Sequence, residues 1–501
     1  MGIKDMKTKK MNQNILHNRS VKFGLLFLGL AIVMSGCAVG PNYKRPTVNT
    51  PATYRQPNED ATTPKPAATP QQSAPSGTAT TQTPAASLGD EKWWDVFQDK
   101  ELQGLIRTAL KNNYDVRIAA TRVLQAQAQL GITRADQLPS LSAGGNITSQ
   151  RSPQNGPIPS FESTRGQLNA SAAWNLDFWG RYRRATEAAR ANLLANEWAQ
   201  KEVMSTLVAS VAIDYFLLRQ LDLELEISKR TLNSRRDSLQ LTQTLEQHGI
   251  SSLLDVRQSE QLVYTASTEI PDLERQIAQE ENAISILLGS NPRDIPRGLK
   301  LTEQPHAPEV PTGIPSALLT RRPDILQAEQ SLIAANAQIG VARAAYFPQI
   351  SLTGTAGYES AALTNLFTGP AGVWNLVGSF SQPIFSGGRL KSNVRLAEAQ
   401  REQMLLAYQQ TIQGAFRDVS NALVAYRKNQ EFRAQQQHLV EAAQDAARLS
   451  EVRFKAGTTD YLEVLTNNTN YFSAELGLAQ AQGNELASLV QLYQSLGGGW
   501  Q

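Results

Sequence analysis

Two pairs of short segments alternate apolar or small residues with polar ones. The first pair covers residues 141–148 and 167–178, and the second covers 350–358 and 374–381. Alternation with a period of two residues is typical of β-strands, and about ten residues is the length of a strand that crosses a membrane. A hairpin in a soluble protein would show the same pattern. These segments therefore predict four strands but do not decide their setting.

A long helical pattern follows each pair of strands. Residues 184–246 contain no proline and keep a helical pattern throughout, and residues 389–455 are similar. At about 1.5 Å per residue, the first of these helices would be ~95 Å long. In the second, apolar residues recur at steps of three and four, the spacing of a coiled-coil seam. These residues are Leu405, Tyr408, Ile412, Phe416, Val419, Leu423 and Tyr426.

Each long helix is followed by a glycine-containing turn and a shorter helix. The turns are His248–Ser252 and Ala456–Thr459. Gly249 and Gly457 permit the positive φ that a tight helix reversal needs. The shorter helix after the first turn contains Pro271, where we expect a kink.

The whole order of patterns occurs twice. Asp115–Ser142 aligns with Asp324–Ser351 at an offset of 209 residues, with ten identical positions. Later pairs keep an offset of 208, as Gly180 with Gly388 and Gly249 with Gly457 do. A near-constant offset over such a distance predicts two structural copies rather than the three domains that the length of 501 residues suggests.

The start of the chain carries most of its positive charge. The net charge is +3 at pH 7, but six basic residues and only one acidic residue lie within 1–36. The basic pI is therefore no evidence for nucleic-acid binding. The apolar run Phe23–Met34 suits the core of a signal peptide.

The only cysteine, Cys37, follows this run directly after Ser35 and Gly36. One thiol excludes a disulfide framework and a cysteine-based metal cluster. Small residues before the cysteine resemble the bacterial lipobox, so we expect lipidation of Cys37; the alternative is an ordinary buried cysteine.

Composition divides the chain further. Residues 46–87 are rich in Pro, Thr, Ala, Gln and Ser, which predicts a disordered tether. The expected domains are a signal peptide (1–36), a lipidated N-terminus with its tether (37–87), and two repeats (88–300 and 301–501).

No motif points to an enzyme. The four histidines, His17, His248, His306 and His438, have no metal-ligand spacing. The sequence contains neither a Gly-x-Ser-x-Gly elbow nor a phosphate-binding glycine loop. Ser386–Gly388 is interpreted as a corner turn, since it matches Gly180 in the first copy. We expect no catalysis, no metal site and no cofactor.

Four strands cannot close a membrane sheet, because the smallest membrane barrels have about eight. The chain is therefore expected to oligomerise, with three copies giving twelve strands and room for a lumen. The long helices would project from the membrane as a tube. A structural or adhesive surface lipoprotein with coiled coils remains the alternative, although it does not explain the duplicated strands.

Several segments resemble the TolC family of outer-membrane efflux proteins, in particular its OprM-like lipoprotein branch. They are Gly36–Pro46, Trp93-Trp94 with Phe97 and Asp99, Arg321–Ile325, Phe347-Pro348 and Leu496–Trp500. The resemblance implies an α+β trimer with a 12-stranded outer-membrane β-barrel, four strands per chain, continued by a long periplasmic α-helical barrel. It also implies a passive exit duct that serves a resistance–nodulation–division pump of the inner membrane through a periplasmic adaptor (a membrane fusion protein).

The resemblance also assigns roles to residues near the helix tips. The adaptor is expected to contact the turns, namely Gly249, Ile250, Ser251, Gly457, Thr458 and Thr459. Glu451 is expected to form an acidic ring at a periplasmic gate, with Arg453 beside it. A type I protein-secretion exit duct is the second interpretation within the channel class.

Overall fold

The computed structural model describes residues 38–48, 50–51, 53–54, 87–157, 159–305, 313 and 315–500. The predicted signal peptide, Cys37 and most of the predicted tether lie outside these residues. The chain forms two compact units. Unit 1 comprises residues 1–47, 123–196 and 328–408, and unit 2 comprises 48–122, 197–327 and 409–501.

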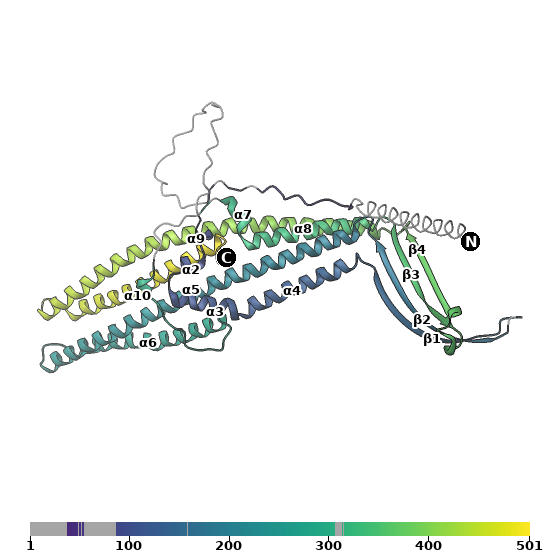
Figure 1. The fold of residues 1–501 in the computed structure, drawn as a ribbon. Coiled ribbons are helices and arrows are strands. Elements are labelled where there is room, and N and C mark those ends of the chain that lie inside the picture. Colours follow the sequence, from purple (N-terminus) through teal and green to yellow (C-terminus); the bar gives the residue numbers. More distant parts are fainter. Residues whose placement is uncertain are drawn as a thin grey trace, which may run out of the picture. The chain divides into compact units, whose positions relative to one another are not determined.

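Unit 1 contains one antiparallel sheet with the order β1-β2-β3-β4 (Figure 1). The strands are β1 (Ser140–Ser152), β2 (Phe161–Leu176), β3 (Gln349–Ser360) and β4 (Gly372–Ser381). All four predicted strands are confirmed. Within the described residues, β1 and β4 each pair along one side only.

The predicted end of the second strand was wrong by two residues. β2 ends at Leu176, because the next residue turns the chain toward a helix. The Asp177 carboxylate accepts a hydrogen bond from the backbone N–H of Arg183 at 2.8 Å, and Gly180 adopts a φ of +77°. A carboxylate on free N–H groups of a first helical turn stabilises that turn.

Helical segments complete unit 1. They belong to α4 (Tyr114–Ala135), α5 (Arg181–Gln247), α8 (Pro323–Ala344) and α9 (Arg389–Lys455), with short turns η4 (Leu363–Asn365) and η5 (Gly369–Ala371) beside the sheet. Small side chains, Ala188, Ala191, Ala334 and Ala337, form the buried contact between α5 and α8. Alanines allow two helix backbones to approach closely.

Unit 2 contains two helical hairpins, α5 with α6 (Leu253–Leu287) and α9 with α10 (Tyr461–Ser495). Both long helices have 67 residues; α9 has the predicted bounds, and α5 extends three residues before and one residue beyond the predicted range of 184–246. The other elements are α2 (Trp93–Val96), α3 (Lys100–Asn112), α7 (Leu318–Arg321), η1 (Leu88–Asp90), η2 (Leu301–Glu303) and η3 (Pro315–Ala317). Pro271 lies inside α6, which runs through it unbroken. Among the described residues, no helix combines the length and apolar character needed to cross a membrane.

The predicted seam of α9 is largely buried. Tyr408, Ile412, Val419, Leu423 and Tyr426 are buried, whereas the remaining two positions are only partly covered. The spacing of three and four residues therefore identified the packed face of the helix correctly.

One hydrogen bond occurs in both copies, at the junction of α3 with α4 in the first copy and of α7 with α8 in the second. In the first copy, the Asn113 side-chain amide donates to the carbonyl of Leu287 at 3.0 Å. In the second copy, the Arg322 guanidinium donates to the carbonyl of Ser495 at 3.2 Å. These residues correspond at the offsets read from the sequence, so the duplication extends to single hydrogen bonds.

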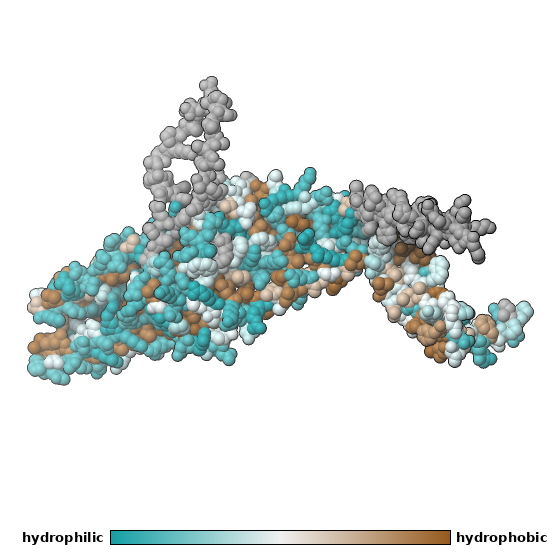
Figure 2. Space-filling view, in the orientation of Figure 1, coloured by the Kyte–Doolittle hydropathy of each residue, from teal (hydrophilic) through white to brown (hydrophobic). Residues whose placement is uncertain are grey.

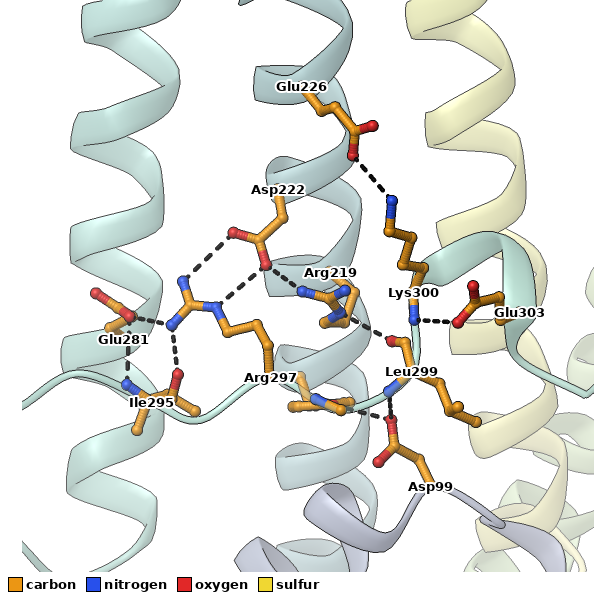
Figure 3. A network of polar contacts seen from close by, with 12 residues as sticks. Asp99, Arg219, Asp222, Glu226, Glu281, Ile295, Arg297, Leu299, Lys300 and Glu303 are labelled. Atoms are coloured by element: carbon orange, nitrogen blue, oxygen red, sulfur yellow. Dashed lines mark hydrogen bonds and ion pairs between the residues drawn. The ribbon is translucent and has the colours of Figure 1, made fainter.

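A polar network fixes the linker between the two copies to α5 (Figure 3). Arg297 of the linker forms ion pairs with Asp222 on α5, at 3.2 Å, and with Glu281 on α6. The Asp99 carboxylate accepts a hydrogen bond from the backbone N–H of Leu299 at 2.9 Å and another from the Tyr215 hydroxyl at 2.9 Å. The linker is therefore held in place by buried and half-buried charges on three helical segments.

Candidate functional site

The tip of the first hairpin is closed by a backbone turn at Gly249. The N–H of Gly249 donates to the carbonyl of Glu246 at 2.8 Å, and the N–H of Ile250 donates to the carbonyl of Leu245 at 2.9 Å. This pair of bonds satisfies the last carbonyls of α5 and needs a left-handed residue, which Gly249 provides with a φ of +74°.

The second hairpin has the same turn at the corresponding residues. Gly457 donates to the carbonyl of Phe454 at 2.9 Å, and Thr458 donates to the carbonyl of Arg453 at 3.0 Å. Gly457 has a φ of +71°. Both glycines were predicted to reverse a helix, and both do.

The first turn is fixed by the side chain of Asp255. Its carboxylate accepts hydrogen bonds from the Ser251 hydroxyl at 2.8 Å and from the N–H of Ser252 at 2.9 Å, while Ser252 caps α6 in return. Burial would raise the pKa of Asp255, but the hydrogen bonds from Ser252 and Ser251 outweigh it and keep the pKa below its ordinary value. The carboxylate therefore remains charged at the tip.

Glu463 takes the corresponding position in the second turn. It accepts a hydrogen bond from the Thr459 hydroxyl and forms an ion pair with Arg453 at 2.8 Å. The gate candidates Glu451 and Arg453 are thus not paired with each other inside one chain. Glu451 instead accepts a hydrogen bond from the Asn468 side chain at 3.4 Å.

A groove of about 830 Å³ separates the two tips. Its lining includes the exposed apolar side chains of Ile250, Leu254 and Leu462 beside the charged Asp460 and Lys455. Figure 2 shows hydrophobic surface at the end of the α5–α6 hairpin, whereas most of the helical surface around it is hydrophilic. A groove that combines exposed apolar side chains with charged and polar ones is suited to bind a protein segment.

The floor of the groove joins the hairpins through α6 and α10. The Tyr461 hydroxyl donates to the Ser259 hydroxyl at 3.0 Å, and both residues are buried. Burial raises the pKa of Tyr461, so its hydroxyl stays neutral and able to donate.

The segment after Cys37 packs on the helices of unit 1. Arg184 on α5 donates to the side chain of Asn42 at 2.7 Å, and Glu329 on α8 pairs with Arg45 at 2.5 Å and Tyr43 at 3.1 Å. Ala38 lies so close to Gly180 that a side chain there would clash with it. Cys37 itself lies outside the described residues, but its neighbour in sequence is held at the corner between β2 and α5.

Sequence reasoning missed several residues at these places. Asp255 carries a local signal, because a serine three residues before an acidic residue is a capping pattern. Glu463 lies three residues after Asp460 in a similar pattern, but its ion pair with Arg453 across the turn has no local signal. The role of Glu329 has none either, because its partner Arg45 lies 284 residues away.

The family model for outer membrane efflux proteins matches this chain twice, at residues 105–290 and 314–498. The chain belongs to the outer membrane efflux protein family. The two matches coincide with the two copies described above.

Individual relatives support this membership over nearly the whole chain. The probable efflux pump outer membrane protein TtgC of Pseudomonas putida is 37% identical over 474 residues, 94% of each chain. The cation efflux system protein CusC of Escherichia coli is 33% identical over 479 residues, 95% of this chain and 99% of the relative. The open state of the MtrE outer membrane channel of Neisseria gonorrhoeae has a TM-score of 0.80 at 30% identity, covering 93% of this chain and 99% of that one.

The fold is therefore that of the TolC-family channels, mostly helical with a four-stranded sheet and two repeats. The protein is an outer-membrane efflux channel component, located in the outer membrane and extending into the periplasm.

Proposed function

We propose that three copies of this chain join their sheets into one closed twelve-stranded barrel and form the passive exit duct of a tripartite efflux system. The observation that carries this proposal is the sheet with two free edges, β1 and β4, within the described residues. Unpaired edge strands favour pairing with another chain, and closure removes them. Exposed apolar residues of unit 2, Tyr114, Ile118 and Ile286, offer a further face that a neighbouring copy would cover.

The test is the oligomeric mass of the detergent-extracted protein, with Cys37→Ala as a second sample. A mass of three chains and a loss of the variant from the outer membrane support the closed duct and the lipid anchor. A monomer, or a trimer without conductance in a planar bilayer, would contradict the proposed duct and favour a structural lipoprotein instead. The domain boundaries proposed with this function are 1–36, 37–87, 88–300 and 301–501.

The groove between the tips would bind a periplasmic adaptor that connects the duct to an inner-membrane resistance–nodulation–division pump. Four of the turn residues expected to contact the adaptor line the groove, namely Ile250, Ser251, Gly457 and Thr459, and the adaptor would also contact Gly249 and Thr458 beside them. The names of the relatives mention toluene, solvents, antibiotics and cations for those proteins. We propose toxic small molecules of this kind as cargo, selected by the pump, with no catalysis in the duct.

Ile250→Asp should abolish adaptor binding, because it puts a charge on the apolar wall of the groove. Leu439→Asp, at another exposed apolar position, on α9 outside the groove, serves as the control and should bind as the original protein does, provided both variants remain trimeric. Equal loss in both variants would argue against the groove.

Glu451 and Arg453 are proposed as gate residues. Threefold symmetry would bring three Glu451 carboxylates together, and such a ring favours cations. Glu451→Gln should reduce the cation selectivity of the bilayer conductance, and an unchanged selectivity would remove Glu451 from the pore.

A further inference from the structure

The face where the first hairpin meets the second contains one buried guanidinium. Arg235 on α5 is only 4% exposed. Its Nη1 donates to the carbonyl of Leu262 on α6 at 2.8 Å, which is a contact within the first hairpin. On the other side it lies over the Phe472 ring of α10, at 4.8 Å from the ring centre.

Two of its three nitrogens, Nε and Nη2, have no hydrogen-bond partner among the described residues, and both are shielded from solvent. No described carboxylate lies within ion-pair distance of Arg235. Burial lowers the pKa of the Arg235 guanidinium, but arginine keeps its proton in proteins. The packed hairpins therefore bury a charge that is only partly compensated by one carbonyl and one ring face.

The rest of this contact is attractive. Ile227 on α5 packs against Phe472 and Ala479 on α10. Arg230, little more than one turn from Arg235, pairs with Glu475 of α10 at the exposed margin of the contact. The two arginines thus act in opposite directions on the same pair of helices.

The duplication shows that the hairpin fold does not require this arginine. At the offset of 208 residues, the position of Arg235 is occupied by Ala443 in α9. Because the chain makes the same hairpin with alanine, the cost of burying Arg235 is not needed to build α5 and α6.

We propose that Arg235 is a positioning residue that destabilises the packing of the α9–α10 hairpin on the α5–α6 hairpin and so holds the two tips ready to separate. In the packed state water cannot reach Nε and Nη2, and separation of α10 from α5 hydrates them. A state that relieves a buried charge is favoured by the free energy of its hydration. This inference deepens the proposed duct function, since separated tips would widen its periplasmic end.

The test measures the distance between spin labels at His248→Cys and Ala456→Cys in the full-length trimer. Arg235→Met keeps the length of the side chain and removes its charge, so the ratio of separated to packed tips should fall about tenfold. The matched control is Arg230→Met on the same helix, which removes the attractive pair and should raise that ratio. An unchanged or increased ratio for Arg235→Met would overturn the proposal.

A second variant protects the test against misfolding of the first. Phe472→Leu removes the ring face but keeps the charge, so it should raise the ratio of separated tips; a decrease would overturn the proposal. Bilayer conductance is recorded in parallel. Absence of conductance in the original protein would reject the duct function, whereas the label distances would still decide the role of Arg235.

Discussion

The tips of the two hairpins share one backbone turn but hold it with different side chains. At the first tip, the Asp255 side chain bonds to Ser251 and Ser252 alone among the described residues, so its contacts stay within the turn and the first residues of α6. At the second tip, Glu463 also pairs with Arg453, which connects the last turn of α9 with the first turn of α10. The position of Arg453 is occupied by Leu245 in the first copy. Duplication has thus preserved the backbone hydrogen bonds, while the side chains have diverged in how firmly they tie two helices together.

The side chains of the two copies differ more strongly at the junctions of α3 with α4 and of α7 with α8. Asn113 is a neutral cap, whereas Arg322 is a partly buried cation that pairs with Asp324 at 2.7 Å and Asp418 at 3.5 Å. Arg322→Ala should cost about 2.5 kcal/mol of local stability, because it removes hydrogen bonds to the Asp324 carboxylate and the Ser495 carbonyl and leaves two partly exposed carboxylates without their cation. Asn113→Ala should cost about 1.5 kcal/mol through loss of the cap and of one hydrogen bond. Amide hydrogen exchange of α8 and α4 measures the two values, and equal costs would contradict the comparison.

A pair of acids distinguishes the copies in their response to pH. Burial raises the pKa of Glu280 to about 7, with a further contribution from Asp214. The corresponding residues of the second copy are Ser488 and Ala422. The pKa of Glu280 in the folded protein lies above its value in the unfolded chain. The protein is therefore at full stability at low pH, where Glu280 is neutral in both states, and it loses stability as the pH rises toward 7 and the unfolded chain releases the proton more readily.

Glu280→Gln should therefore stabilise the protein at about pH 8 by about 1.5 kcal/mol after allowance for solvent screening, with little effect at about pH 5. The thermal midpoint of the protein at both pH values is the measurement. Ser488→Ala serves as the control and should shift the midpoint equally at both. A pH-independent effect of Glu280→Gln would reject the titration.

The caps of the shorter helices differ by a smaller amount. Asp255→Ala should cost about 1 kcal/mol, because it removes the bonds that the carboxylate accepts from the Ser252 N–H and the Ser251 hydroxyl, while the bond from the backbone N–H of residue 255 to the Ser252 hydroxyl remains. Asp460 occupies the N-cap of α10 but makes no side-chain cap bond. Asp460→Ala should therefore change the exchange protection of its turn by only about 0.3 kcal/mol, through the helix dipole. A loss as large as that of Asp255→Ala would show that the two caps are equivalent.

The smallest effect is expected when the ion pair of the second tip is introduced at the first tip. Leu245→Arg together with Asp255→Glu reproduces the pair of Arg453 and Glu463, and should raise the protection of the first turn by about 0.5 kcal/mol. Leu245→Arg alone is the control. If the double variant gains nothing over the single one, the ion pair at the second tip contributes no stability either.

What the sequence predicted depended on local signals. The strands follow from a period of two residues and the long helices from the absence of proline, and the reversals at Gly249 and Gly457 follow from glycine between two helical patterns. The second strand was extended too far, because Asp177 and Phe178 continue the alternation although Asp177 binds the start of α5. Local periodicity does not show where a side chain leaves the sheet to cap a helix.

The side-chain contacts at the helix tips and around Arg235 could not be predicted from the sequence. The pair of Arg453 and Glu463 joins residues on both sides of a turn, so its existence depends on the angle between two helices. The burial of Arg235 depends on which neighbouring helix covers that face of α5, and nothing in the sequence near Arg235 distinguishes it from the exposed Arg236. Such features need the packing of a distant segment, here Phe472.

The two free sheet edges have a consequence for the synthesis of the protein. A chain that has been exported but has not met its partners presents two templates for strand addition, and β4 is exposed along its whole length with Trp374 and Phe380 on it. Both correct assembly and edge-to-edge aggregation depend on collisions between chains, but only correct assembly has a fixed stoichiometry. Overproduction should therefore direct newly made chains into insoluble aggregates, and slow synthesis should favour insertion into the outer membrane.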